Sequence, residues 1–114
     1  MSDFLFLTTS EFEKEFKRLK KKYKSISDDL RNFKTQYSIN PNLGVDLGSN
    51  IKKIRIAIKS KGKGKSGGAR LITYDLIVNF TKYGVVLVTI FDKSEVESIS
   101  NNQIKQILLR NGFK

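Results

Sequence analysis

The chain has 114 residues, of which 22 are Lys or Arg and 11 are Asp or Glu, so its net charge at pH 7 is +11. This length suits one domain, residues 1–114, and a hydrophobic fraction of 39% is too high for a disordered basic tail. Because Cys and His are both absent, disulfides and thiolate chemistry are excluded, and we expect neither a metal nor a cofactor. The charge instead indicates a polyanionic partner.

The first half of the chain predicts a strand followed by two helices. Residues 4–7 form a short apolar run that ends at the helix-capping residues 8–10. The apolar residues of a first amphipathic helix recur at helical spacing: Phe12, Phe16, Leu19 and Tyr23. Those of a second helix repeat this spacing: Ile26, Leu30, Phe33 and Tyr37. We expect the two to form a hairpin, and residues 40–50 to form a loop.

The second half predicts three strands and a last helix. Apolar residues alternate at Ile54, Ile56 and Ile58, and residues 70–80 and 85–91 are rich in strand formers, with a turn at 81–84. Ser100 and Gln103 can cap a final helix that ends at Gly112. The order β-α-α-β-β-β-α is that of an α+β domain with an antiparallel sheet. We expect the early helices and the core to pack on one face of it.

Eight cations gather within twenty residues: Lys52, Lys53, Arg55, Lys59, Lys61, Lys63, Lys65 and Arg70. No acid occurs between Asp46 and Asp75. A solvated loop is one interpretation. The four glycines of residues 62–68 favour another, because they let backbone amides and cations approach a phosphate chain closely. Gly62, Gly64 and Gly67 also match the G-x-G-x-x-G motif. Because this segment leads into a strand and not into a helix, we expect no nucleotide-binding site.

Three other features bear on a nucleic-acid interface. The lysine run of residues 14–24 is either a solvated helix face or a secondary contact to a large RNA. Tyr74 and Phe91 lie on predicted strands, where an aromatic residue either packs in the core or stacks on a base. Tyr74 shares strand parity with Arg70, which favours one common face. We expect Phe91 to be exposed, because it ends its strand just before Lys93.

The stretch IKKIRIAIKSKGKGKSGGARLITY, followed by LVTIFDKSE and a terminal helix, resembles the RelE/ParE toxin superfamily, and within it the HigB-type, RelE-like toxins. The resemblance implies a toxin of a type II toxin-antitoxin system. Such a toxin is a ribosome-dependent mRNA endoribonuclease that inhibits translation, using 2′-hydroxyl attack on the adjacent phosphate without metal or cofactor. The implied partners are the ribosome, mRNA and a protein antitoxin, commonly with a helix-turn-helix domain. Operator DNA would be bound only through the antitoxin.

The resemblance also implies roles for individual residues. The implied catalytic residues are Arg70, which stabilises the phosphate, with Lys59, Lys61 and Lys93. The implied RNA-binding residues are Arg55, Lys63, Lys65, Tyr74 and Phe91. Related toxins usually carry a tyrosine at the position of Phe91, whose ring can stack on a base but cannot exchange a proton.

Two alternatives share the predicted fold. A ParE-like DNA gyrase inhibitor would not need the dense lysine and glycine loop. A catalytically silent RNA-binding module is consistent with phenylalanine at position 91. The sequence has no basic leader and no segment long enough to span a bilayer, so we expect a cytoplasmic protein without membrane contact.

Overall fold

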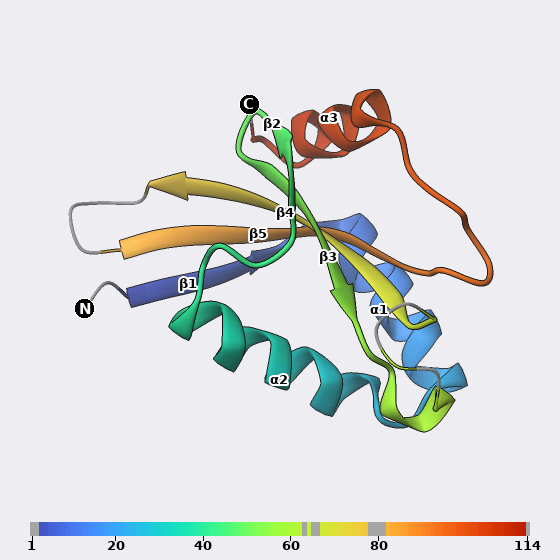
Figure 1. The fold of residues 1–114 in the computed structure, drawn as a ribbon. Helices are drawn as coiled ribbons and strands as arrows, with labels where there is room; N and C mark the ends of the chain where they lie inside the picture. The colour runs from blue at the N-terminus through green and yellow to red at the C-terminus, as the bar shows by residue number, and fades with distance from the viewer. Residues whose placement is uncertain (1–2, 63, 65–66, 78–81, 114) are drawn as a thin grey trace.

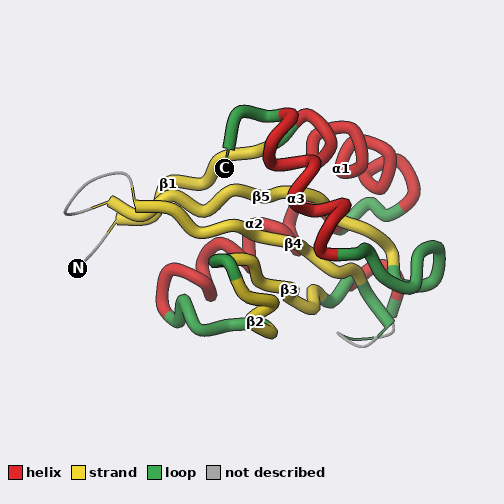
Figure 2. Tube along the Cα trace, turned by 90° about the horizontal axis from the view of Figure 1, so that it is seen from above, coloured by secondary structure: helices red, strands yellow, loops and turns green. Residues whose placement is uncertain are grey.

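The computed structural model describes residues 3–62, 64, 67–77 and 82–113. Their elements follow the order β1 Asp3–Thr8, α1 Ser10–Lys22, α2 Ile26–Ile39, β2 Val45–Gly48, β3 Ile51–Ile56, a 3₁₀ turn Lys59–Lys61, β4 Ala69–Ile77, β5 Lys82–Asp92 and α3 Asn101–Arg110 (Figure 1). The five strands form one sheet in the order β1-β5-β4-β3-β2 (Figure 2). β1 is parallel to β5, and all other neighbours are antiparallel. The chain is therefore a small α+β domain with a mostly antiparallel sheet.

The two early helices cover one face of the sheet. The side chain of Thr9 caps α1 by accepting a 2.9 Å hydrogen bond from the Phe12 amide. Tyr23 ends α1, and α2 begins three residues later. The apolar positions of both helices pack on inward residues of the strands, and the first core consists mainly of Phe12, Leu19, Ile26, Phe33, Tyr37, Ile54, Ile56, Leu71, Leu87 and Ile90. The spacing of apolar residues predicted both helices correctly.

α3 covers the opposite face, so the prediction of a core on one face only is wrong. Ser100 and Gln103 form the expected capping box at its start. Its apolar side packs on a second cluster: Ile51, Ile72, Val86, Val88, Phe91, Ile104, Ile107 and Leu108. Figure 2 views this face, with α3 in front of the strands and α2 behind them. The central strand β5 is consequently buried on both faces from Gly84 to Asp92.

The antiparallel meander of β3, β4 and β5 is confirmed, with two differences at its margins. Gly84 belongs to β5 and pairs with Leu76, so the turn predicted at 81–84 is wrong there. Residues 78–81 lie outside the described part. Within the predicted loop 40–50, β2 pairs with the start of β3. Gly44 permits this approach, because a Cβ there would lie 2.6 Å from the Ile54 side chain.

Among the described residues, no helix is both long and apolar enough to cross a membrane.

Candidate functional site

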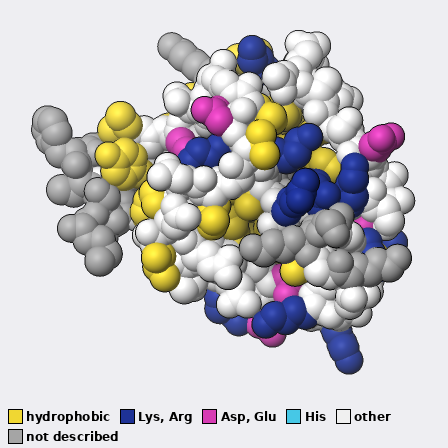
Figure 3. All heavy atoms as spheres, viewed as in Figure 1, with side chains coloured by type: hydrophobic (Ala, Val, Ile, Leu, Met, Phe, Trp, Pro, Cys, Tyr) yellow, Lys and Arg dark blue, Asp and Glu magenta, His cyan; other side chains and the backbone are white. Residues whose placement is uncertain are grey.

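The site is built on three neighbouring strands that bring Arg55, Arg70 and Phe91 into one row. Arg70 on β4 pairs with Arg55 on β3 and with Phe91 on β5. Directly paired residues point to the same face of a sheet, and Phe91 belongs to the cluster under α3. The row therefore lies on the α3 face. Figure 3 shows Lys and Arg side chains gathered toward the right of the view, where β4 begins and β5 ends in Figure 1.

The guanidinium of Arg70 is held in an unfavourable place for a cation. Arg70 is only 7% exposed, whereas Arg55 is exposed beside it. Burial lowers the pKa of Arg70, and the adjacent charge of Arg55 lowers it further. Arginine nevertheless stays protonated in proteins, so two like charges persist side by side. A bound phosphate would relieve this repulsion, which makes the row a candidate anion site.

Lys61 does not belong to this row, because it is held in an ion pair with Asp92. Its Nζ lies 2.6 Å from Asp92 Oδ1 and 3.0 Å from Ser94 Oγ. The fully buried carboxylate of Asp92 also accepts a 2.5 Å hydrogen bond from the Tyr23 hydroxyl. Its contacts are therefore directed toward Asp92 and Ser94 and away from the row. Lys61 thus joins the end of the 3₁₀ turn to the end of β5.

The pKa of Asp92 shows how strongly this carboxylate is held. Burial raises the pKa, but the hydrogen bonds from Lys61, Tyr23 and Ser94 lower it more, so the net shift is downward. The carboxylate of Asp92 therefore stays ionised throughout the neutral range. The ion pair of Lys61 and Asp92 links the start of the lysine- and glycine-rich loop, residues 62–68, to the end of β5, one residue beyond Phe91.

Further hydrogen bonds fix both ends of the loop. The amide of Ser60 donates to Ser25 Oγ at 2.9 Å, and the amide of Lys59 donates to Asp29 Oδ2 at 3.2 Å. At the other end, the amide of Lys93 donates to the Gly68 carbonyl at 3.1 Å, two residues before Arg70. The described ends of the loop are thus attached to α2 and to the end of β5.

The other predicted site residues are more dispersed. Lys59 is exposed, and with Arg55 it lines a cavity of about 320 Å³ between α2 and β3. Lys93 follows β5 and donates through Nζ to the Glu97 carbonyl at 3.0 Å. Tyr74 lies on the face of Arg70, but four residues along β4, or roughly 13 Å away. Lys63 and Lys65 lie outside the described residues.

Phe91 differs from the prediction, because it is 6% exposed and belongs to the second core. The reason is that α3 returns over this face of the sheet and covers the end of β5. Tyr74 is half-buried for the same reason, with its ring centre 6.4 Å from that of Phe113 at the end of the chain. The aromatic residues of this face contribute more to packing than to an open stacking surface.

Sequence reasoning missed the anchoring role of Asp92 and Tyr23. The signal available in the sequence was an acid directly after a continuous apolar strand, a place where a carboxylate needs a partner. A second such acid is Asp75, inside the apolar run of β4. It accepts hydrogen bonds from the Tyr37 hydroxyl at 3.0 and 3.2 Å and pairs with Lys52 at 3.2 Å. This second cluster lines a cavity of about 740 Å³ at the other end of the sheet.

No group of three Asp or Glu side chains that could hold a metal ion occurs among the residues that the structure describes. No family model matches the sequence.

Proposed function

We propose that this protein is a RelE-like, HigB-type toxin of a type II toxin-antitoxin system. In this proposal it enters the ribosome and cleaves mRNA without a metal, and a protein antitoxin neutralises it. Apart from the added strand β2, the element order agrees with the β-α-α-β-β-β-α order expected for RelE-like proteins, and this agreement supports the proposal. A RelE-like topology in detail is itself part of the proposal. The observation that carries the proposal is the buried guanidinium of Arg70, flanked on its two neighbouring strands by Arg55 and Phe91.

The chemistry suited to this site is attack of a ribose 2′-hydroxyl on the adjacent phosphate. The O2′–P bond forms as the 2′-hydroxyl loses its proton, and the P–O5′ bond breaks as the leaving 5′-oxygen takes up a proton, which leaves a cyclic phosphate and a free 5′-hydroxyl. Negative charge develops on the phosphate oxygens in the transition state, where Arg70 can donate two parallel hydrogen bonds. Arg55 adds a second positive charge at the rim. Because Arg70 lies largely buried between β3 and β5, it needs little reorganisation to act.

Proton transfer is assigned to lysine, since the chain contains no histidine. Lys61 is engaged by Asp92, so Lys59 and Lys93 are the described candidates for taking the proton of the 2′-hydroxyl.

A second candidate function is RNA binding without cleavage. Phe91 favours it, because a phenyl ring lacks the hydroxyl that related toxins carry at this position. In this alternative the Arg55–Arg70 row would bind phosphate but would not increase the rate of its cleavage.

Primer extension on a translated mRNA tests the proposal. We expect the protein to cut mRNA only in the presence of ribosomes, and Arg70→Ala to abolish cutting while ribosome association persists. The expected increase in the barrier is about 3 kcal/mol or more. Arg31→Ala is the matched control, because Arg31 is an exposed arginine paired with Asp28 on α2. We expect that variant to keep full activity, and Phe91→Tyr to keep or increase it.

Three outcomes contradict the proposal. If the wild type binds ribosomes but leaves mRNA intact, the silent RNA-binding function is correct. If it produces double-strand breaks in DNA with purified gyrase and no mRNA cleavage, a gyrase inhibitor is correct. If Arg70→Ala cuts as fast as the wild type, Arg70 is not catalytic.

A further inference from the structure

The outer side of α1 carries lysines that the proposed site does not use. Four of them lie on the helix: Lys14, Lys17, Lys20 and Lys21. At 100° per residue, Lys14, Lys17 and Lys21 fall within about 60° of one another, and Lys20 lies about 60° further round. All four are exposed. We call this set the α1 lysine stripe, and its length along the helix is about 10 Å.

The stripe differs from the other cations of α1 because its charges are not neutralised. Arg18 lies 2.8 Å from Glu95 and 3.1 Å from Glu15, and Lys22 lies 3.1 Å from Glu95. Within the described part of the chain, no carboxylate pairs with any lysine of the stripe, although Glu13 lies on the same helix. Glu15 and Glu95 thus neutralise one side of α1. The other side carries Glu13 beside the four lysines and keeps a net charge of about +3.

Several features of the stripe match the phosphate backbone of a duplex. A duplex carries about one phosphate charge per 1.7 Å of its axis, so a rigid stripe of about 10 Å faces several phosphates. Lysine is a compact point charge that contacts phosphate without reading a base. The aromatic residues Phe12, Phe16 and Tyr23 all pack inward against the first core, so the stripe offers no stacking surface for single-stranded bases. For the same reason α1 has no free apolar side to insert into a membrane.

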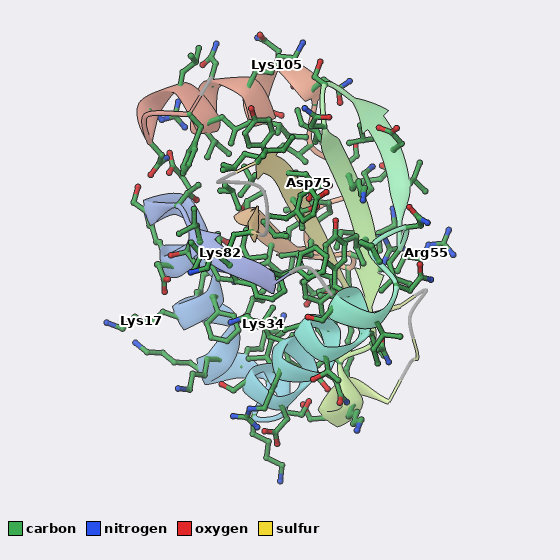
Figure 4. The ribbon with its side chains drawn as sticks, turned by 90° about the vertical axis from the view of Figure 1, so that its left-hand side faces the viewer. Lys17, Lys34, Arg55, Asp75, Lys82 and Lys105 are labelled. Atoms are coloured by element: carbon green, nitrogen blue, oxygen red, sulfur yellow. The ribbon has the colours of Figure 1, made fainter. Side chains whose placement is uncertain are left out.

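The stripe also faces away from the proposed site. In Figure 4, Lys17 and Arg55 point away from the body of the protein on opposite sides. One RNA segment bound at the Arg55–Arg70 row would therefore leave the stripe free for a second segment.

We propose that the α1 lysine stripe binds the phosphate backbone of double-helical RNA, separately from the RNA bound at the Arg55–Arg70 row. The assignment to RNA rests on the proposed function, whereas binding to a duplex backbone rests on the stripe itself. The protein then sits between two RNA segments, with its sheet toward one and α1 toward the other.

The test is equilibrium binding to an RNA duplex of about 16 base pairs and arbitrary sequence, without ribosomes, measured over a range of salt. The stripe variant is Lys14→Gln, Lys17→Gln and Lys21→Gln together. Its matched control removes the same charge from other elements, by Lys34→Gln, Lys82→Gln and Lys105→Gln together. Glutamine has nearly the helix propensity of lysine, and Lys82 is the exposed first residue of β5, so both variants should fold.

We expect the stripe variant to lose about tenfold or more in affinity at about 0.1 M salt, with a slope of log K against log salt that is shallower by roughly 2 to 3. The control variant should retain most of the affinity and most of the salt slope of the wild type. Equal losses in the two variants would overturn the proposal, since net charge alone would then explain binding. No loss in either variant would also overturn it, because the stripe would then make no contact with the duplex. Tighter binding to a DNA duplex or to anionic vesicles, with the same lysine dependence, would overturn the assignment to RNA.

This assay can be told apart from the test of the proposed function. If the stripe variant loses affinity for the duplex, as expected, but wild-type protein cuts no mRNA, the proposed function alone is wrong. If wild-type protein cuts mRNA but the stripe variant binds the duplex normally, the inference about the stripe alone is wrong.

Discussion

Two clusters at opposite ends of the sheet contain the same three residue types. At one end Asp92 binds Tyr23 and Lys61, and at the other Asp75 binds Tyr37 and Lys52. In each, the tyrosine comes from α1 or α2, and the lysine ammonium lies over its ring, 5.6 Å from the centre in the first cluster and 5.1 Å in the second.

The clusters differ in burial, and burial gives them different roles. The side chain of Asp92 is fully buried, and that of Lys61 is 11% exposed. In the second cluster Asp75 is 31% exposed and Lys52 is 19% exposed, and both line the larger cavity. Water can replace a lost partner at Asp75 but not at Asp92. The first cluster therefore fixes the 3₁₀ turn Lys59–Lys61 to the end of β5, whereas the second contributes to a cavity wall.

The largest expected difference is in stability. Asp92→Ala leaves the Lys61 ammonium and the Tyr23 hydroxyl without their shared acceptor in a buried place, so we expect a loss of about 3 kcal/mol or more in the free energy of unfolding. Asp75→Ala leaves Lys52 bonded to the Pro41 carbonyl and partly hydrated, and should cost about 1 kcal/mol. Urea unfolding at pH 7 measures both. Similar losses in the two variants would show that burial does not separate the clusters.

The second difference concerns activity and rests on the proposed function. Lys61→Met removes the tether between the 3₁₀ turn and the end of β5 but keeps an unbranched apolar stem. We expect mRNA cleavage to fall roughly tenfold, because a small displacement of the loop disturbs the phosphate contacts. Lys52→Met makes the same chemical change at the other cluster and should leave cleavage unchanged. If both variants cut at the wild-type rate, the loop does not depend on Asp92.

The pH dependence of stability provides a third comparison. The pKa of Asp92 is lower in the folded protein than in the unfolded chain, so its contribution is present above the unfolded pKa of about 3.9 and is lost as pH falls below that value. The unfolding free energy of the wild type should therefore fall between about pH 5 and pH 2 more steeply than that of Asp92→Asn. Urea titrations at pH 7, 4 and 3 provide the measurement. Parallel curves would contradict the downward shift of the Asp92 pKa.

The sequence predicted the parts of this fold that depend on local pattern. Helical spacing identified α1 and α2, alternation identified β3, and Ser100 with Gln103 identified the start of α3. These signals are local because each element must bury its own apolar side. The alternation at Ile54 and Ile56 did not reveal that α3 covers the other face, since burial on two faces depends on where a distant helix returns.

The site was only partly predictable for the same reason. Arg70 was singled out by the resemblance to RelE-like toxins, but its pairing with Arg55 and Phe91 depends on strand register. The ion pair of Lys61 and Asp92 joins residues 31 positions apart. No local pattern distinguishes Lys61 from its neighbours in a lysine-rich loop, and only the packing of α1 against β5 encloses Asp92.

The smallest expected difference in the free energy of unfolding comes from removing the two tyrosine hydroxyls. Tyr23→Phe removes a hydrogen bond to a buried carboxylate, for which we expect a loss of about 1.5 kcal/mol, because bonds to charged groups exceed neutral ones. Tyr37→Phe removes the bonds to Asp75 and from Lys52, but these partners keep each other and are partly hydrated, so the loss should be about 0.5 to 1 kcal/mol. Because the Tyr23 hydroxyl lowers the pKa of Asp92, Tyr23→Phe should also move the acid unfolding transition to higher pH. Tyr37→Phe should not move it by this route. Urea unfolding at pH 7, followed by acid titration of the same two variants, separates the predicted roles. An equal acid shift in both variants would mean that the transition does not report on Asp92.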